Sequence, residues 1–371
     1  MGGPYANPAR GFSVRTYSSP AVTHRISVVA PTYKRRRGLP RFVEPLLREP
    51  ELHELVMAVD GSDDGSVEWL EERRRDDERI VVLDLPNRGA GATRQAGIEA
   101  ASGDVVLLLD DDVIAEPGLV AGHLGHHRDL EPKVVIGYMP NDWKGLPRRR
   151  RGIAYIYREA YELRCSEFRA DPDLVLHGFW GGNFSMPRRD FLRVGVEGIA
   201  VKRGQDDREF GIRCAKAGMR AVFDPRLVGE HLYDRNLAQY RSDCRFQGES
   251  VRLIHDLHAD LVGKELAETP GPSHVADAVG QRLPAVVRRA WPVLARDPFF
   301  GGVTAGLTAL FEAGIRLEHL GLEVQAARAI GSLETMRGVI TQSERAGAGA
   351  APAPRAPEAL AGSRQARRDR V

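Results

Sequence analysis

Four short apolar runs in the first third of the chain alternate with segments of helical periodicity. The runs are nearly continuous in apolar and β-branched residues, as in strands buried on both faces of a parallel sheet; they read RISVVAPT, ELVMAVD, RIVVLDL and DVVLLLD. The segments between them have the spacing and end residues of helices; they read LPRFVEPLL, GSVEWLEERRR and GAGATRQAGIEAA. This alternation predicts an α/β fold with a doubly wound, mostly parallel sheet flanked by helices.

We expect five segments along the chain. Residues 1–24 are rich in Gly, Pro and Ser and predict a flexible arm. Residues 346–371 are rich in Ala, Pro and Arg and predict a disordered tail. Between these ends, we expect two halves of one α/β domain at 25–120 and 121–262. The apolar and charged faces of 263–345 recur at helical spacing, which predicts a C-terminal helical extension.

The predicted strand ends carry polar residues, and ligands of doubly wound sheets bind at the carboxyl ends of strands. The first run ends in Pro31, Thr32 and Tyr33, and the second ends in Asp60. The fourth run leads directly into three adjacent acids, Asp110–Asp112, with no basic residue beside them. Three carboxylates at the end of a buried strand repel one another, so we expect a cation there.

Charge and cysteine content exclude several other classes. The chain has 53 Lys and Arg against 51 Asp and Glu, a net charge of +2, which gives no electrostatic case for a nucleic-acid partner. Its three cysteines match neither a disulfide framework nor a zinc site. The first residues lack the apolar region of a signal peptide, and no apolar run reaches transmembrane length. A cytoplasmic protein is therefore expected.

Four motifs occur in order at the predicted strand ends: VVAPTYKR, AVDGSDDGS, NRGAGATRQAG and LLLDDDV. Together they resemble the nucleotide-sugar half of the family 2 glycosyltransferases with the GT-A fold. The later segments GGNFSMPRRDFLRVGVEG and QDDREFGIRCAKAG are similar to the family's acceptor side, which extends the resemblance to about Leu232. The resemblance implies a metal-dependent, inverting hexosyltransferase that moves a sugar from a UDP- or dTDP-sugar donor to an acceptor hydroxyl.

The resemblance also implies donor-side roles. Asp110 and Asp112 would hold Mn²⁺ or Mg²⁺, with His231 as a third ligand, although an isolated histidine is as often an ordinary polar residue. Asp60 would accept a hydrogen bond from the imide of uracil or thymine, and a turn role is its alternative. Further residues would bind the nucleotide: Pro31, Thr32, Tyr33, Gly91, Arg94, Asp110 and Asp111. For Tyr33 simple packing, and for Arg94 a solvated helix face, are the alternatives.

On the acceptor side, Asp207 is the candidate general base that takes the proton of the attacking hydroxyl. Asp206 stands where the family has glutamate, as Val59 stands where it has a first acid, and both Asp206 and Asp207 suit the start of a helix. Trp180, Gly182 and Asn183 are candidates for an acceptor platform, with core packing as the alternative for Trp180.

Other interpretations stay open. GAGATR followed by Asp110 is similar to a dinucleotide-binding fingerprint, but Arg94 replaces its small third residue. A catalytically inert relative that only binds nucleotide-sugars is a second alternative. The basic run Tyr33–Arg37 follows the first strand and would border the diphosphate. For this run and for Lys144–Arg151, the alternatives are a solvated face and contact with a phosphorylated acceptor or with the anionic inner surface of a membrane. The helical extension would close the acceptor side or form a homodimer.

Overall fold

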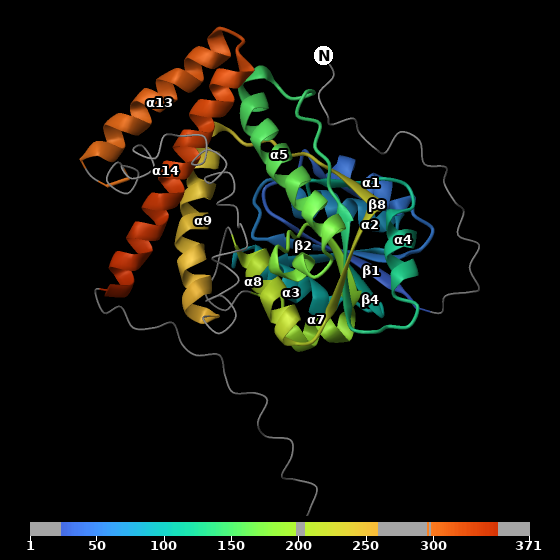
Figure 1. Ribbon diagram of the computed structural model, residues 1–371. Coiled ribbons are helices and arrows are strands. Elements are labelled where there is room, and N and C mark those ends of the chain that lie inside the picture. The colour runs from blue at the N-terminus through green and yellow to red at the C-terminus, as the bar shows by residue number, and fades with distance from the viewer. Residues whose placement is uncertain (1–23, 198–204, 259–294, 297, 348–371) are drawn as a thin grey trace, which may run out of the picture.

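The computed structural model describes residues 24–197, 205–258, 295–296 and 298–347 (Figure 1). The predicted flexible arm and disordered tail fall almost entirely outside the described residues. The same is true of the proposed boundary between 262 and 263 and of the first part of the helical extension.

An eight-stranded mixed sheet forms the centre of the described protein. Its order is β3-β2-β1-β4-β7-β6-β8-β5. The strands are β1 (Ile26–Thr32), β2 (Leu52–Asp60), β3 (Ile80–Leu85), β4 (Val105–Leu109), β5 (Val113–Ala115), β6 (Lys133–Tyr138), β7 (Asn183–Pro187) and β8 (Arg220–His231). Strands β3, β2, β1 and β4 are mutually parallel, as predicted, whereas β7 runs antiparallel to both of its neighbours.

Helices flank the sheet and continue beyond it. They are α1 (Leu39–Leu47), α2 (Ser66–Asp76), α3 (Ala90–Ala100), α4 (Leu119–His126), α5 (Arg148–Ala170), α6 (Leu174–His177), α7 (Arg188–Val194), α8 (Asp206–Lys216), α9 (Leu237–Leu257), α13 (Phe299–Arg316) and α14 (Leu320–Gly347). The predicted fold class, an α/β sheet flanked by helices with a C-terminal helical region, is confirmed.

Burial on both faces explains the continuous apolar runs. In β1, Val28 belongs to the core on one face of the sheet and Val29 to the core on the other, and both are fully buried. Helix α3 approaches β1 so closely that a Cβ on Gly97 would lie 2.5 Å from Cγ1 of Val29. This close packing fixes the helix, and with it Arg94, beside the ends of the parallel strands.

Helices α9, α13 and α14 pack together at one side of the sheet domain, and the long helix α5 connects them to it (Figure 1). Buried acids join these helices. Glu334 of α14 accepts hydrogen bonds from Arg241 and Arg245 of α9, and Glu323 of α14 pairs with Arg148 of α5. Helix α9, placed by its sequence position in the second α/β half, therefore packs as part of the helical extension.

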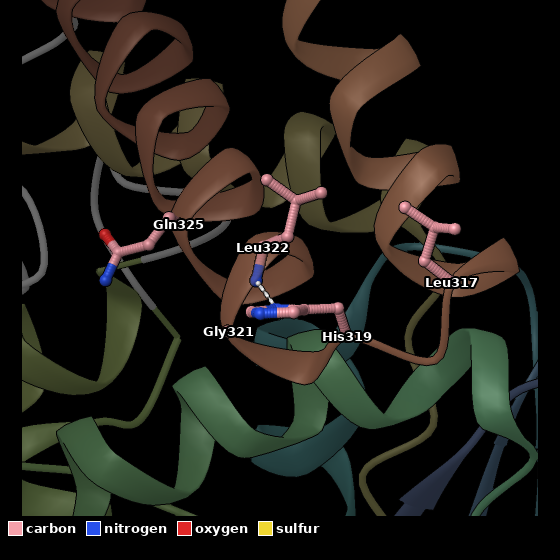
Figure 2. A pocket seen from close by; sticks show the side chains of 5 residues that line it. All are labelled: Leu317, His319, Gly321, Leu322 and Gln325. Atoms are coloured by element: carbon pink, nitrogen blue, oxygen red, sulfur yellow. Dashed lines mark hydrogen bonds between the residues drawn. The ribbon is translucent and has the colours of Figure 1, made fainter.

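An apolar hollow of about 470 Å³ lies at the turn between α13 and α14, where Leu317 is 73% exposed (Figure 2). Its lining residues come from this turn and the start of α14, and none of the candidate site residues is among them. Within the described parts of the chain, no helix is both long and apolar enough to span a bilayer.

Candidate active site

The candidate site lies at one edge of the sheet. Thr32 and Asp60 end the neighbouring parallel strands β1 and β2, and Asp110 follows β4 on the other side of β1. Strand β7 begins at this edge, because Asn183 pairs with Leu109 in antiparallel register. The topology thus brings the Trp180–Gly182 loop beside the three aspartates.

Two arginines pair with the adjacent aspartates. The Arg35 guanidinium bridges two of them, with Nε donating to Oδ1 of Asp111 at 3.2 Å and Nη2 donating to Oδ2 of Asp112 at 2.6 Å. Arg94 Nη2 donates to Oδ1 of Asp110 at 2.7 Å. Arginine side chains thus lie in this structure against the aspartates where the sequence predicts a cation.

Arg94 also connects the two halves of the site. Its Nη1 lies 3.6 Å from Oδ2 of Asp206 and 3.8 Å from Oδ1 of Asp207, both at the start of α8. Burial alone would lower the pKa of Arg94, but the carboxylates of Asp110, Asp207 and Asp206 outweigh it and raise the pKa. One guanidinium therefore holds the candidate donor side and the candidate base together.

The side chain of Asp207 is partly exposed to solvent, and its pKa is raised. Its side chain is 32% exposed, and its Oδ2 accepts a hydrogen bond from the Gly181 N–H at 3.0 Å. Burial and the neighbouring Asp206 raise the pKa of Asp207 to about 7, against the opposing effect of Arg94. A carboxylate of this pKa can accept a proton near neutral pH, as a general base must.

Glycine is required next to both acids. A Cβ on Gly181 would lie 2.8 Å from Oδ1 of Asp207, and a Cβ on Gly182 would lie 3.0 Å from Oδ2 of Asp110. Gly182 also has a φ of +114°, which favours glycine. The glycine pair thus lets the loop backbone approach the carboxylates of both halves.

The pKa values of Asp111 and Asp112 are shifted in opposite directions. Burial raises the pKa of Asp111 to about 6, although Arg35 opposes the shift. Burial would also raise the pKa of Asp112, but His231 and Arg35 outweigh it and lower the pKa to about 2. Asp112 is therefore the member of this pair that stays ionised at every physiological pH.

His231 ends β8 and lies against Asp112, with 3.5 Å between its Nε2 and Oδ1 of the acid. Its Nδ1 is 2.8 Å from the Tyr157 hydroxyl, within hydrogen-bond distance. Tyr157 stacks on Tyr233 and meets the edge of Trp180, with ring centroids 4.0 Å and 5.3 Å apart. The sequence-predicted Trp180 thus belongs to an aromatic cluster behind the metal-ligand candidates.

The donor atoms fit a hard divalent cation in part. Carboxylate oxygens and an imidazole are ligands that Mn²⁺ and Mg²⁺ accept, and Asp112 and His231 are already adjacent. One buried carboxylate oxygen, Oδ2 of Asp111, has no hydrogen-bond partner. Asp110, however, is directed to Arg94, and no group of three or more potential metal ligands is assembled in the part of the chain that the structure describes.

Asp60 is buried and shapes the loop before α3. Its Oδ1 and Oδ2 accept hydrogen bonds from the backbone N–H groups of Arg88 and Gly89 at 2.7 and 3.0 Å. These contacts are those of a turn residue, which is the alternative to base recognition that the sequence analysis left open for Asp60. Tyr33 is 48% exposed, and the Lys34 ammonium lies over its ring, 5.5 Å from the ring centroid.

The structure places other candidates differently. Thr32 and Asn183 are both buried, whereas Pro31 and Gly91 are half-buried at the site's edge. Asn183 does not reach the surface at all: its amide donates to the Leu227 carbonyl and its Oδ1 contacts His123 Nε2. The expectation that Asn183 forms part of an acceptor platform is therefore replaced by a core role.

Sequence reasoning did not single out Arg35 or Gly181 as site residues, although it placed the basic run of Arg35 beside the expected diphosphate. Arg35 lies in the basic run after the first strand, which has no pattern that separates a bridging arginine from its exposed neighbours. In the second basic run, Arg148 contacts Glu323, Arg150 lies 3.3 Å from Asp234, and Arg151 donates to the Leu146 carbonyl. That run contributes contacts within the protein.

Residues 27–195 match the sequence model of glycosyl transferase family 2. Over this segment the chain is similar to that family. The match covers the parallel strands, the three aspartates and the glycine pair, and it ends before Asp207.

Named relatives agree with the family. The chain is 31% identical over 268 residues to validoxylamine A glucosyltransferase of Streptomyces hygroscopicus subsp. limoneus, covering 62% of this chain and 58% of the relative. It is 28% identical over 177 residues to glucosyl-dolichyl phosphate glucuronosyltransferase of Haloferax volcanii, covering 46% and 55%. The chain thus spans less than two thirds of the length of these relatives.

Among solved structures, the chain is similar to a mannosyltransferase of Pyrobaculum calidifontis in complex with GDP-Man and Mn²⁺. The TM-score is 0.48 at 16% identity, and the alignment covers 85% of this chain and 89% of that one.

Proposed function

We propose that this protein is an inverting, metal-dependent glycosyltransferase that moves a sugar from a UDP- or dTDP-sugar to an acceptor hydroxyl. The observation that carries the proposal is the contact of Arg94 with Asp110 on one side and with Asp206 and Asp207 on the other. A single-displacement transferase needs its leaving-group side and its base within one site, and Arg94 spans that distance.

In the proposed reaction the acceptor oxygen attacks C1 of the sugar while its proton passes to Asp207. The bond between C1 and the diphosphate oxygen breaks, and the nucleoside diphosphate leaves with that electron pair. A raised pKa suits Asp207 to this task, because the carboxylate is a stronger base than an ordinary aspartate. The Gly181 N–H holds one carboxylate oxygen and so orients the other.

On the donor side, Asp110, Asp112 and His231 would hold Mn²⁺ or Mg²⁺. The bound cation would neutralise charge on the leaving diphosphate. The exposed Tyr33 ring would stack on the base, and Asp60 holds the loop that borders it. The relative active on validoxylamine A and the relative active on a dolichyl phosphate have different acceptors, and the acceptor of this chain is left open.

A thermal-unfolding panel of UDP, dTDP, GDP, CDP and NAD, each with Mn²⁺ or with EDTA, tests the donor side of the proposal. UDP or dTDP should stabilise the protein far more with Mn²⁺, by about 2.7 kcal/mol at a hundredfold excess over the dissociation constant. Equal stabilisation by the nucleotide in EDTA would contradict the assignment of a metal ion to the site. NAD binding as tight as UDP binding would favour a dinucleotide-binding enzyme. If the protein binds nucleotide-sugars but turns none of them over, it would be a catalytically inert relative that only binds them.

A further inference from the structure

The carboxylates proposed to hold the cation are already paired with arginines. Five acids gather here, Asp110–Asp112 with Asp206 and Asp207, and Arg35 and Arg94 are the arginines that pair with them. Arg35 occupies Oδ2 of Asp112, while Oδ1 of the same acid is directed to His231. A divalent cation that uses Asp112 therefore meets a positive charge already in place.

The two arginines are held very differently. Arg94 is only 12% exposed and lies within 4 Å of three separate carboxylates, so its position is fixed from several sides. Its contact with Asp110 uses Oδ1 and leaves Oδ2 of that acid for another ligand. Arg35 is 41% exposed and extends from the loop between β1 and α1, so its guanidinium can move into solvent without a desolvation cost.

We propose that Arg35 is an exchangeable internal counter-ion that competes with the divalent cation for Asp111 and Asp112. The inference rests on the proposed function and deepens it, because it names the side chain that must leave before the cation binds. Arg94 stays in place and continues to hold Asp110 beside Asp207.

Competition has a definite thermodynamic consequence. Each cation that binds must first break the two charged hydrogen bonds of Arg35, at 3.2 and 2.6 Å, so the observed cation affinity is the intrinsic affinity reduced by that cost. The released guanidinium then stands beside the cation, where a diphosphate can accept its hydrogen bonds. Arg35 should therefore weaken binding of the cation alone and strengthen its coupling to a nucleoside diphosphate.

Titration calorimetry of Mn²⁺ into the full-length protein without nucleotide tests this directly. Arg35→Gln should bind Mn²⁺ about five- to tenfold more tightly than the wild type, since the competing charged hydrogen bonds to Asp111 and Asp112 are gone. Arg37→Gln is the matched control: it removes the same charge two residues away at an exposed position, and its Mn²⁺ affinity should change by less than about twofold.

A second titration measures the coupling, as the ratio of UDP affinities with and without Mn²⁺. This ratio should fall in Arg35→Gln and stay at the wild-type value in Arg37→Gln. An unchanged or weaker Mn²⁺ affinity in Arg35→Gln, in protein whose thermal unfolding matches the wild type, would overturn the inference. So would an equal gain in both variants, because that would reflect net charge alone.

Asp112→Asn separates this failure from failure of the proposed function. If Asp112→Asn loses Mn²⁺ while Arg35→Gln binds it unchanged, the metal site stands and competition by Arg35 is wrong. If Asp112→Asn binds Mn²⁺ as the wild type does, the cation does not use this acid, and both the metal assignment and the competition fall.

Discussion

Arginine–carboxylate pairs occur both in the helical extension and at the sheet edge, but the balance of charge differs between the two regions. In the extension, Glu334 is almost completely buried and pairs with two arginines, Arg241 and Arg245. At the sheet edge, five acids share Arg35 and Arg94, and several of the acids are partly exposed. The first arrangement neutralises its acid fully, whereas the second leaves negative charge for a ligand.

We infer that the ion pairs of the helical extension stabilise the fold, whereas the ion pairs at the sheet edge form part of a ligand-binding site. A buried acid with its partners in place resists removal of any member, since the remaining charge has no water to solvate it. An excess of acids at an accessible edge costs stability unless a cation arrives. Burial, with a contribution from the neighbouring acids, raises the pKa values of Asp111 and Asp207, so the charged forms of both carry a cost.

The largest effect is expected in the extension. Glu334→Gln should lower the free energy of unfolding by about 3 kcal/mol, because two arginines lose their common carboxylate. Denaturant unfolding at pH 7.5 measures the change. Glu344→Gln, at an exposed position of the same helix, is the control and should lie within about 0.5 kcal/mol of the wild type.

The corresponding change at the sheet edge should have the opposite sign. Asp111 has a raised pKa, so the folded state binds its proton more tightly than the unfolded state, and above about pH 6 its charge opposes folding. Asp111→Asn should therefore leave stability at pH 7.5 unchanged or increase it. If both Glu334→Gln and Asp111→Asn destabilise equally, the proposed division between the two regions is wrong.

The next effect concerns the base. Asp207→Asn should lower kcat by about 10²-fold or more, while nucleotide and Mn²⁺ still bind, because the proton acceptor acts only as the hydroxyl attacks. In the wild type, kcat/KM should rise with pH up to about 7 and then level off, since Asp207 must be ionised and its pKa is raised to about 7.

Asp206→Asn is the matched control for the base, because it removes the adjacent charge at the same helix start. It should retain most of the activity and shift the rising limb of the pH profile to lower pH, as a like charge next to Asp207 is removed. Near wild-type transfer by Asp207→Asn would mean that the base lies elsewhere. Glu209 is a poor substitute, because it is buried and bound to Arg213 and His258.

The sequence predicts the parallel strands and their helices well, because burial on both faces leaves continuous apolar runs and helices leave periodic ones. The strand ends also predict the position of Asp110 and Asp112, whereas His231 is expected beside them only from the family resemblance. The sequence does not predict which side chains pair. Arg35 and Arg37 look alike in the sequence, and only the path of the loop after β1 sets Arg35 against the aspartates.

Local patterns likewise cannot separate a ligand contact from a loop contact. Asn183 follows two glycines as an exposed platform residue would, yet the antiparallel pairing of β7 turns it into the core. Asp60 ends its strand as a base-binding acid would, and its contacts in this structure are to the backbone of the loop before α3. The tertiary path of the chain decides both cases.

The smallest effect is expected at Asp60, a buried acid at the sheet edge whose carboxylate accepts hydrogen bonds from the backbone. Asp60→Asn replaces one acceptor oxygen by an NH₂ group that faces a backbone N–H of Arg88 or Gly89, so one donor of a part-buried hydrogen bond loses its partner. We expect a loss of about 1–2 kcal/mol in the free energy of unfolding.

UDP affinity should also fall if the loop borders the nucleotide. Urea unfolding and nucleotide titration on the same variant tell the two roles apart. A loss of stability with unchanged UDP affinity assigns Asp60 to the loop alone, and a loss of affinity with unchanged stability restores direct recognition of the base.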